Sequence, residues 1–292
     1  MAVVIEAAGV DYSYQVDSAS PRKALRQVSL SVQAGELIAL IGTTGSGKST
    51  LLQLIAGLLL PQSGTARVLS TDLSSPKLKE KELDALRRRV VIALQRPEDM
   101  LFETYLGDDV AYGPRNYGLT GHQLALTVQS AMERVGLSYS LFKDRRCDSL
   151  SGGEKRKGAL AGVLALDPEI LLLDEPAAGL DAASAGELFR LISGIHDEGR
   201  TILFSTHDMT QAALADRVGL FSGGRLAALL PPGELFANSK LLDEAGVQPP
   251  AGIRLLNILK AAGLKPGKIS AQADPEETAD MIAALFGGRT PA

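Results

Sequence analysis

The sequence predicts an α/β fold in which a parallel sheet carries crossover helices, joined to an antiparallel β subdomain, a helical subdomain and a C-terminal helical tail. Apolar strands and helical segments alternate from residue 170 to about 218, the pattern of a parallel sheet. An apolar strand at 37–41 leads into a glycine-rich turn and a helical run at 51–55. Residues 3–41 alternate apolar and polar residues in short strands, which predicts the antiparallel part.

The glycine-rich turn after residues 37–41 has the composition of a phosphate-binding loop. Its glycines let successive backbone N–H groups turn inward around phosphates, its lysine reaches the β and γ oxygens, and the next serine hydroxyl binds Mg²⁺. An incidental glycine-rich turn is the alternative, but strand, loop and helix stand in the order that this chemistry requires. The residues expected to hold the phosphates are Gly42, Thr43, Thr44, Gly45, Ser46, Gly47, Lys48, Ser49 and Thr50, with Ser49 also a metal ligand.

A second apolar strand, residues 170–173, ends in the acidic pair Asp174 and Glu175. A buried parallel strand is a continuous apolar run, and a core does not accept unpaired carboxylates. Asp174 at the strand end suits the ligand shell of Mg²⁺, whereas Glu175 can accept a proton from a water that attacks the γ-phosphate. A solvated strand end is the alternative for a single Asp, but it is rare beside a phosphate-binding loop.

A second candidate anion site lies at Ser151, Gly152 and Gly153, which predict the N-cap and first turn of a helix continuing through 155–157. Small residues leave the N–H groups bare, and the helix dipole adds partial positive charge there. An ordinary helix cap is the alternative for so short a motif. Two phosphate-facing loops in one domain suggest a nucleotide that is shared between two subunits.

Together these motifs resemble the nucleotide-binding subunit of ATP-binding cassette (ABC) transporters, over about residues 3–236. The resemblance implies an ATPase that uses ATP and Mg²⁺. It implies that Tyr14 stacks on adenine, although Tyr12 on the same strand face is a competitor, and Tyr14 could be an ordinary strand residue. It also implies that Gln95 senses Mg²⁺ and the attacking water, and that His207 is a switch residue at the γ-phosphate.

In the same family, the turn 151–154 matches the signature loop, and Asp181 ends the loop 179–181 that couples the two nucleotide sites. Two positions depart from the family pattern. Glu154 stands where the signature usually has Gln, and Ala177 stands where Thr is usual after the proline that follows Glu175. Because a carboxylate near the γ-phosphate repels it, we expect Glu154 to point away along its helix or to pair with a cation such as Arg156 or Lys157.

Within that family the chain resembles the ATPases of energy-coupling factor (ECF) importers, which take up vitamins or transition-metal ions. The resemblance rests on an acidic segment at 95–103 and a Gly-Pro-Arg-Asn run at 113–116. It implies a membrane coupling subunit of the EcfT type, a substrate-binding membrane subunit and a second ATPase, either the same chain or a paralogue. We expect Glu98, Asp99 and Glu103 to dock the coupling subunit, although a capped helix with Leu101 and Phe102 in the core is the alternative.

The expected organisation is an ATP-binding cassette at 1–235 and a C-terminal helical domain at 236–292. Residues 76–157 are expected to be mostly helical, with interruptions at 95–98 and 113–116, and a hairpin at 222–225 closes the cassette. Amphipathic helices at 253–262 and 275–286 need a surface to cover, either their own cassette or a second copy.

Composition narrows the classes of partner. A net charge of −4 argues against general nucleic-acid binding, which usually needs a basic excess. The single Cys147 has no second cysteine to pair with, which favours a reducing compartment. No leader peptide and no run of about 20 apolar residues is visible. We therefore expect a peripheral protein on the cytoplasmic face of the cell membrane that borrows its membrane domain from another chain.

Other functions remain open at this level. A conventional ABC importer or exporter ATPase is the closer alternative, and a cassette ATPase that works on DNA or ribosomes is the more distant one. The latter classes carry long coiled coils or two cassettes in one chain, and neither pattern occurs in this sequence.

Overall fold

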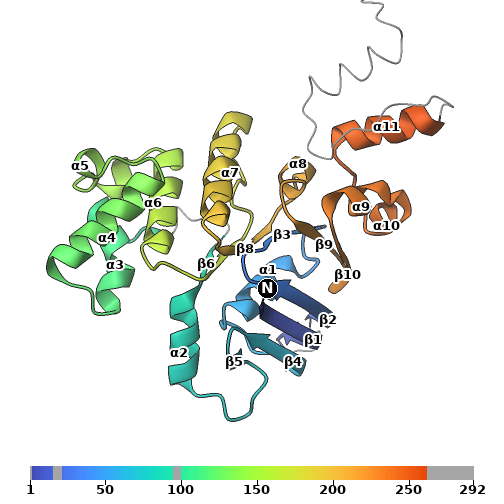
Figure 1. Cartoon of the computed structure of the whole chain (residues 1–292), viewed down its shortest axis with the longest axis horizontal. Coiled ribbons are helices and arrows are strands. Elements are labelled where there is room, and N and C mark those ends of the chain that lie inside the picture. Colours follow the sequence, from blue (N-terminus) through green and yellow to red (C-terminus); the bar gives the residue numbers. More distant parts are fainter. Residues whose placement is uncertain (1, 16–21, 95–99, 262–292) are drawn as a thin grey trace, which may run out of the picture.

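The protein is described by a computed structural model that covers residues 2–15, 22–94 and 100–261. Two sheets lie side by side at its centre, with a group of helices at one end of the long axis and the last helices at the other (Figure 1). The prediction of an α/β fold with an antiparallel sheet, a helical group and C-terminal helices is confirmed.

The larger sheet has six strands in the order β10-β9-β3-β8-β7-β6. All neighbouring pairs are parallel except β9 and β10, which form the hairpin expected at 222–225. Residues 201–205 of β8 are all buried, as a central strand covered on both faces requires. Its strands are β3 (Leu37–Gly42), β6 (Val90–Ala93), β7 (Ile170–Leu173), β8 (Thr201–Ser205), β9 (Arg217–Ser222) and β10 (Arg225–Leu230).

The smaller sheet is antiparallel, in the order β2-β1-β4-β5. Two of its strands are 12 residues long, so the expectation of short strands at 3–41 is wrong. They pair over nearly their full length, from Val3 opposite Gln33 to Tyr14 opposite Arg22. The strands are β1 (Val3–Tyr14), β2 (Arg22–Gln33), β4 (Ser63–Val68) and β5 (Thr71–Asp72).

Two apolar cores occupy the two faces of the parallel sheet. Residues of β3 alternate between them: Leu37, Ala39 and Ile41 belong to the core that the helical group and α7 cover, while Ile38 and Leu40 belong to the core under the antiparallel sheet. The helices that pack on the sheets are α1 (Lys48–Ile55), α2 (Glu80–Arg89), α7 (Ala182–Asp197) and α8 (Met209–Ala212). The carboxyl ends of β3, β7 and β8 consequently share one edge, where open α/β sheets bind ligands.

The helical group differs from the sequence prediction at two places. Residues 90–93 form β6 because their apolar side chains complete the edge of the parallel sheet beside β7. The expected break at 113–116 is absent, since α3 continues through Pro114 and ends at Asn116. The group consists of α3 (Leu106–Asn116), α4 (Gly121–Arg134), α5 (Tyr139–Phe142), η2 (Cys147–Ser149) and α6 (Gly152–Leu164).

The C-terminal helices that the structure describes are α9 (Pro232–Ala237), α10 (Ser239–Glu244) and α11 (Ala251–Ala261). Leu235, Phe236 and Leu242 are fully buried in the core that also holds α7, so α9 and α10 pack on their own cassette. On α11, Ile258 is exposed. The predicted helix at 275–286 lies outside the described residues. None of the helices with described residues has the length and apolarity to cross a membrane.

Helices α3 and α6 approach closely at Gly158, which yields a stability prediction. A methyl group added there would lie 2.6 Å from Cδ1 of the fully buried Leu106, whereas the nearest atom to one added at Gly162, one turn later, is 4.0 Å away. We expect Gly158→Ala to lower the free energy of unfolding by about 1–2 kcal/mol, because overpacking outweighs the gain in helix propensity. Gly162→Ala should raise it by about 0.5 kcal/mol. Urea unfolding curves of both variants measure this, and a stable Gly158→Ala protein would contradict the close packing.

Candidate active site at the carboxyl edge of the parallel sheet

The glycine-rich turn lies between β3 and α1 and has a backbone that only glycine tolerates at two points. Gly42 and Gly47 have φ angles of 141° and 112°. A methyl group on Gly42 would lie 2.2 Å from the carbonyl oxygen of Phe221, and one on Gly47 would lie 2.6 Å from that of Ala24. The turn is therefore wedged between β9 and the start of β2, and its shape is fixed without a ligand.

Lys48 closes this loop from the inside. The side chain is 3% exposed, and Nζ donates hydrogen bonds to the carbonyl oxygens of Gly42 at 2.8 Å and Thr43 at 3.2 Å. Burial lowers the pKa of the Lys48 ammonium, and the nearby carboxylates of Glu175 and Asp174 oppose that shift. An ammonium held by two neutral carbonyls at a glycine-rich turn is suited to an anionic ligand.

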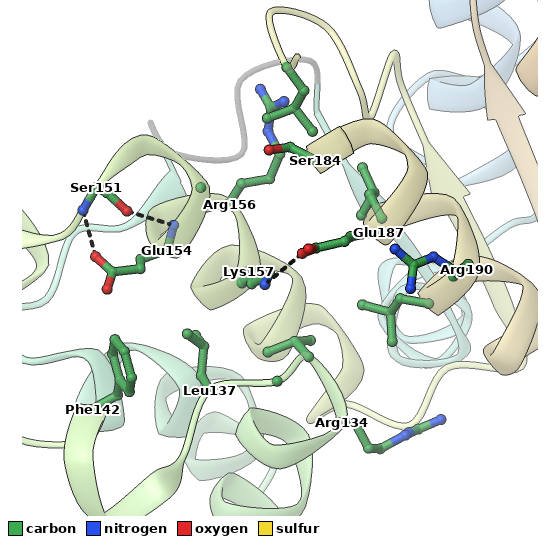
Figure 2. Close-up of a pocket in the computed structure, with 16 residues that line it drawn as sticks. Arg134, Leu137, Phe142, Ser151, Glu154, Arg156, Lys157, Ser184, Glu187 and Arg190 are labelled. Carbon is green, nitrogen blue, oxygen red and sulfur yellow. Dashed lines mark hydrogen bonds and ion pairs between the residues drawn. The ribbon is translucent and has the colours of Figure 1, made fainter. Parts of the chain in front are cut away.

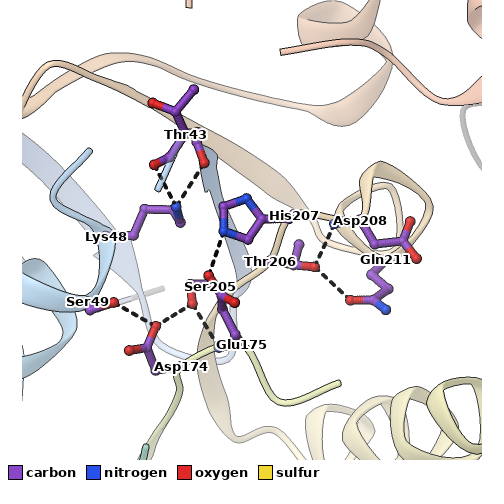
Figure 3. A network of polar contacts seen from close by, with 11 residues as sticks. Thr43, Lys48, Ser49, Asp174, Glu175, Ser205, Thr206, His207, Asp208 and Gln211 are labelled. Atoms are coloured by element: carbon purple, nitrogen blue, oxygen red, sulfur yellow. Dashed lines mark hydrogen bonds and ion pairs between the residues drawn. The ribbon is translucent and has the colours of Figure 1, made fainter. Parts of the chain in front are cut away.

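Asp174 connects the loop helix to the parallel strands (Figure 3). Its Oδ1 accepts hydrogen bonds from Ser49 Oγ on α1 at 3.0 Å and from Ser205 Oγ at the end of β8 at 2.5 Å. The carboxylate is 7% exposed, so these two hydroxyls compensate most of its lost hydration. The Ser49 hydroxyl and the Asp174 carboxylate converge as hard oxygen donors, the type that Mg²⁺ prefers, so the residues present fit that ion.

Glu175 and His207, which the sequence placed on different strands, are in direct contact. Nε2 of His207 lies 2.6 Å from Oε1 of Glu175, with both side chains at the same edge of the sheet (Figure 3). Glu175 has a φ of 48°, an uncommon value for a non-glycine residue. Its N–H donates to Ser205 Oγ at 2.8 Å, which holds the peptide in this conformation.

Ser205 is the functional residue that sequence reasoning missed. It is fully buried, and its one hydroxyl both donates to Asp174 and accepts from the Glu175 backbone. The signal in the sequence was a serine ending a buried apolar strand two residues before His207. Serine at such a place needs hydrogen-bond partners, but the sequence does not reveal which ones.

The turn at 151–154 has the predicted helix cap. Ser151 Oγ accepts from the N–H of Glu154, and the Glu154 carboxylate accepts from the N–H of Ser151, which makes a reciprocal capping box (Figure 2). Oε1 of Glu154 also lies 3.1 Å from Nη1 of Arg145. The Ser151 backbone bond and, less strongly, Arg145 lower the pKa of Glu154.

The expectation that Glu154 pairs with a cation is confirmed, but the cation is Arg145 and not one of the two residues named. Arg145, which precedes the helix in the sequence, takes the place expected for Arg156 or Lys157, while Lys157 Nζ pairs with Glu187 of α7 at 3.4 Å. The reason is geometric, since a capping carboxylate turns back toward the chain that enters the helix. A cavity of about 620 Å³ opens beside this turn, between α6 and α7 (Figure 2). Among the residues with described contacts, no hydrogen bond or ion pair joins the turn to Lys48 or Ser49.

Tyr14 lies at the far side of the loop helix. Its hydroxyl is 3.3 Å from both Thr50 Oγ1 and Gln53 Oε1 of α1, so the side chain faces the start of that helix. The competing Tyr12 meets it edge to face, with ring centroids 5.0 Å apart, and packs against the core under the antiparallel sheet. Burial raises the pKa of Tyr12. Tyr14 is therefore better placed than Tyr12 to contact a ligand at the loop.

The remaining predicted site residues fall in other places. Asp181 is the N-cap of α7 and accepts hydrogen bonds from Ser184 N–H at 3.0 Å and Ser184 Oγ at 2.7 Å, and these bonds lower its pKa. Gln95, Glu98 and Asp99 lie outside the described residues. Glu103 is described, and its N–H donates to the buried carboxylate of Asp109 at 2.9 Å.

The double role of Ser205 yields a prediction. Ser205→Ala removes a donor from the buried Asp174 carboxylate and an acceptor from the Glu175 peptide, so we expect a loss of about 1–3 kcal/mol in unfolding free energy and a lower ATPase rate. Thr201→Val is the matched control, because it removes a buried hydroxyl at the other end of β8 that accepts from Gly35 N–H. It should destabilise the protein without changing the ATPase rate. Thermal unfolding and steady-state phosphate release on both variants separate the two effects, and an unchanged rate in Ser205→Ala would refute its role.

Comparison with known proteins identifies the family of this chain. Residues 25–178 match the family model described as ABC transporter. The chain is 42% identical, over 90% of both chains, to the energy-coupling factor transporter ATP-binding protein EcfA2 of Symbiobacterium thermophilum. It is also 42% identical to the cobalt import ATP-binding protein CbiO of Rhodobacter capsulatus, over 92% of this chain and 93% of that one.

Solved structures of ABC ATPases have the same fold. The structure of cbiO1 from Clostridium perfringens, described as part of the ABC transporter complex cbiONQ, superimposes with a TM-score of 0.74 at 30% identity, covering 90% of this chain and 100% of that one. A dimeric bacterial ABC transporter cassette, MJ0796, shares the fold with a TM-score of 0.71 at 24% identity, over 78% of this chain and 98% of that one. The chain therefore belongs to the ABC transporter family, as an ATP-hydrolysing subunit of the energy-coupling factor and CbiO type.

Proposed function

We propose that this chain binds ATP with Mg²⁺ and hydrolyses it to energise an ECF-type importer of a vitamin or a transition-metal ion. The observation that carries the proposal is the cluster of Lys48, Ser49, Asp174, Glu175 and His207 at one edge of the parallel sheet. The names of the relatives, an energy-coupling factor ATP-binding protein and a cobalt import protein, support the transport role. The cargo is chosen by another subunit.

In the proposed site, the phosphates lie on the turn of residues 42–50 with the Lys48 ammonium at the β and γ oxygens. Ser49 and Asp174 hold Mg²⁺, and Gln95 contributes from the segment that follows β6. When bound, the ion neutralises charge on the β- and γ-phosphate oxygens. The 3.0 Å separation of the Ser49 hydroxyl and the Asp174 carboxylate supports this assignment, because both can turn their lone pairs to one ion.

Glu175 is proposed to take the proton from the water that attacks the γ-phosphate. Its contact with His207 Nε2 at 2.6 Å supports this role, since the imidazole fixes the direction of the carboxylate. The hydrogen bond from its N–H to the buried Ser205 anchors the peptide that carries it. His207 is 43% exposed, so it remains able to reach a ligand at the mouth of the site.

A second ATPase chain is proposed to complete each nucleotide site. The signature turn presents Ser151, Gly152 and Gly153 with no atom within 4 Å of a methyl group at either glycine, so a partner's phosphate can approach the backbone closely. Tyr14 stacks on adenine and Asp181 lies at the contact between sites. The proposed division is a cassette at 1–235 and a C-terminal domain at 236–292. Because Phe236 and Leu242 are buried in the cassette core, the part of that domain beyond α10 is proposed as the further contact between the two ATPases.

We propose that an integral membrane coupling subunit of the EcfT type docks near residues 98–103. Residues 101–104 line a groove of about 380 Å³, and Phe102 in its wall is 62% exposed. Leu101, in contrast, packs against the core, so the alternative of core burial holds for that residue. Hydrogen bonds from the N–H groups of Phe102 and Glu103 to Asp109 hold these two residues in place. A substrate-binding membrane subunit completes the importer, and the ATPase lies peripherally on the cytoplasmic face of the membrane.

The role of Glu175 is tested by Glu175→Gln. We expect ATP binding to persist while hydrolysis slows by about 100-fold or more, the usual contribution of a positioned base, so that a closed dimer accumulates. Lys48→Ala should instead weaken ATP binding itself. The control is Glu169→Gln, the same change at the opposite end of β7, where the carboxylate pairs with Arg89. Phosphate release and size-exclusion chromatography with ATP check this, and parent-like hydrolysis by Glu175→Gln would remove Glu175 from the mechanism.

The docking surface is tested by replacing Glu98 with Gln and Asp99 with Asn. We expect copurification with the membrane subunits and substrate uptake to fall several-fold while the basal ATPase rate of the soluble protein stays unchanged, because rim charges orient a partner more than they add affinity. The control carries the same charge change on α2, with Glu80→Gln and Asp84→Asn, where both acids lie beside Arg87. Unaltered assembly of the Glu98 and Asp99 variant would refute docking at this segment.

A further inference from the structure

Arg22 opens β2 and stands directly opposite Tyr14 in the antiparallel ladder. Directly opposed residues of an antiparallel pair place their side chains on the same face of the sheet. The face is known from Tyr14, whose hydroxyl lies 3.3 Å from Thr50 Oγ1 at the start of α1. The Arg22 side chain is therefore directed to the same side as the phosphate-binding turn.

The contact of Arg22 with that turn is close. Nη2 of Arg22 lies 2.7 Å from the point where a methyl group on Gly45 would stand, and the guanidinium carbon lies 4.0 Å from it. Gly45 has a φ of 76°, so the turn presents bare backbone to the guanidinium. Within the described part of the chain, the exposed Arg22 guanidinium has no ion pair or hydrogen bond with another residue. A cation thus lies on the phosphate-binding turn without a carboxylate to compensate it there.

The neighbouring cation, Lys23, shows that this placement follows from strand geometry. Lys23 follows Arg22 in β2, so its side chain points to the other face of the sheet. There its Nζ pairs with Asp11 of β1 at 2.8 Å. Asp11 also accepts hydrogen bonds from Ser63 and Gln27, and this set, with Lys23 first, lowers its pKa. Of these two adjacent basic residues, Lys23 forms an ion pair within the antiparallel sheet and Arg22 faces the phosphate-binding turn.

We propose that Arg22 binds the β- and γ-phosphates of ATP from the outer side of the turn, which makes it a nucleotide-binding residue in addition to the turn itself. The inference rests on the proposed function and deepens it. Lys48 Nζ sits at the carbonyls of Gly42 and Thr43, within three residues of Gly45, and the lysine of such a loop serves the β- and γ-phosphates. Arg22 approaches the same part of the loop, and its planar guanidinium can donate two parallel hydrogen bonds to phosphate oxygens.

The test compares nucleotides that differ only in phosphate number. Isothermal titration calorimetry with a non-hydrolysable ATP analogue, ADP and AMP measures each dissociation constant for the parent, Arg22→Gln and Arg22→Lys proteins. We expect Arg22→Gln to weaken binding of the ATP analogue and of ADP about tenfold and binding of AMP less than twofold, because one charge-assisted contact is lost. Arg22→Lys, which keeps the charge but not the fork, should fall between Arg22→Gln and the parent.

The controls separate this role from two others. Lys23→Gln removes a positive charge from the adjacent residue and should leave all three dissociation constants within twofold of the parent. If Arg22→Gln weakens all three nucleotides equally, Arg22 only positions Tyr14 and the proposal is wrong. Unchanged binding of the ATP analogue overturns it as well. A parent protein that binds none of the nucleotides would refute the proposed function itself. A parent protein that binds the nucleotides, with an Arg22 variant that binds them equally well, would refute only the role of Arg22.

Discussion

The buried carboxylate of Asp174 is the constraint on which the site depends. Asp174 directly follows β7, and its Oδ1 accepts hydrogen bonds from Ser49 of α1 and Ser205 of β8. A carboxylate at 7% exposure is costly unless it is compensated, so these hydroxyls must stay in place. In consequence these hydrogen bonds hold α1 against the carboxyl ends of β7 and β8. A cation at this edge of the sheet can replace a hydroxyl as the partner of Asp174.

Glu175, at the same edge of the sheet, has an uncommon backbone conformation. Its φ of 48° is uncommon for a non-glycine residue, and its N–H donates to the Ser205 hydroxyl that also donates to Asp174. One buried serine therefore contacts the Asp174 carboxylate and the Glu175 peptide, and His207 contacts the Glu175 carboxylate. The geometry is set by main-chain positions on adjacent parallel strands, which places the reactive groups on rigid elements.

The signature turn, residues 151–154, has its own hydrogen bonds and its own ion pair. The capping box satisfies the first helical N–H groups with Ser151 and Glu154, and Arg145 compensates the carboxylate that the family pattern does not have at this position. The Glu154 carboxylate contacts the N–H of Ser151 and the guanidinium of Arg145, both in the chain that enters the helix. The space around Gly152 and Gly153 stays open although Glu stands at this position in place of Gln.

The sequence by itself determined where the local parts of this protein lie, since the order of strand, glycine-rich turn and helix, the apolar run before Asp174 and the cap at Ser151 are patterns of residues within a few positions of one another. Only the tertiary structure decided what depends on neighbours from distant segments. Residues 90–93 became a strand because β7 offered an edge, and α3 runs through Pro114 to Asn116. The partner of Glu154, the double role of Ser205 and the approach of Arg22 to Gly45 likewise require the packing of separate elements. Hydrogen bonds and ion pairs between distant residues leave no periodic trace in the chain, so only the folded molecule reveals them.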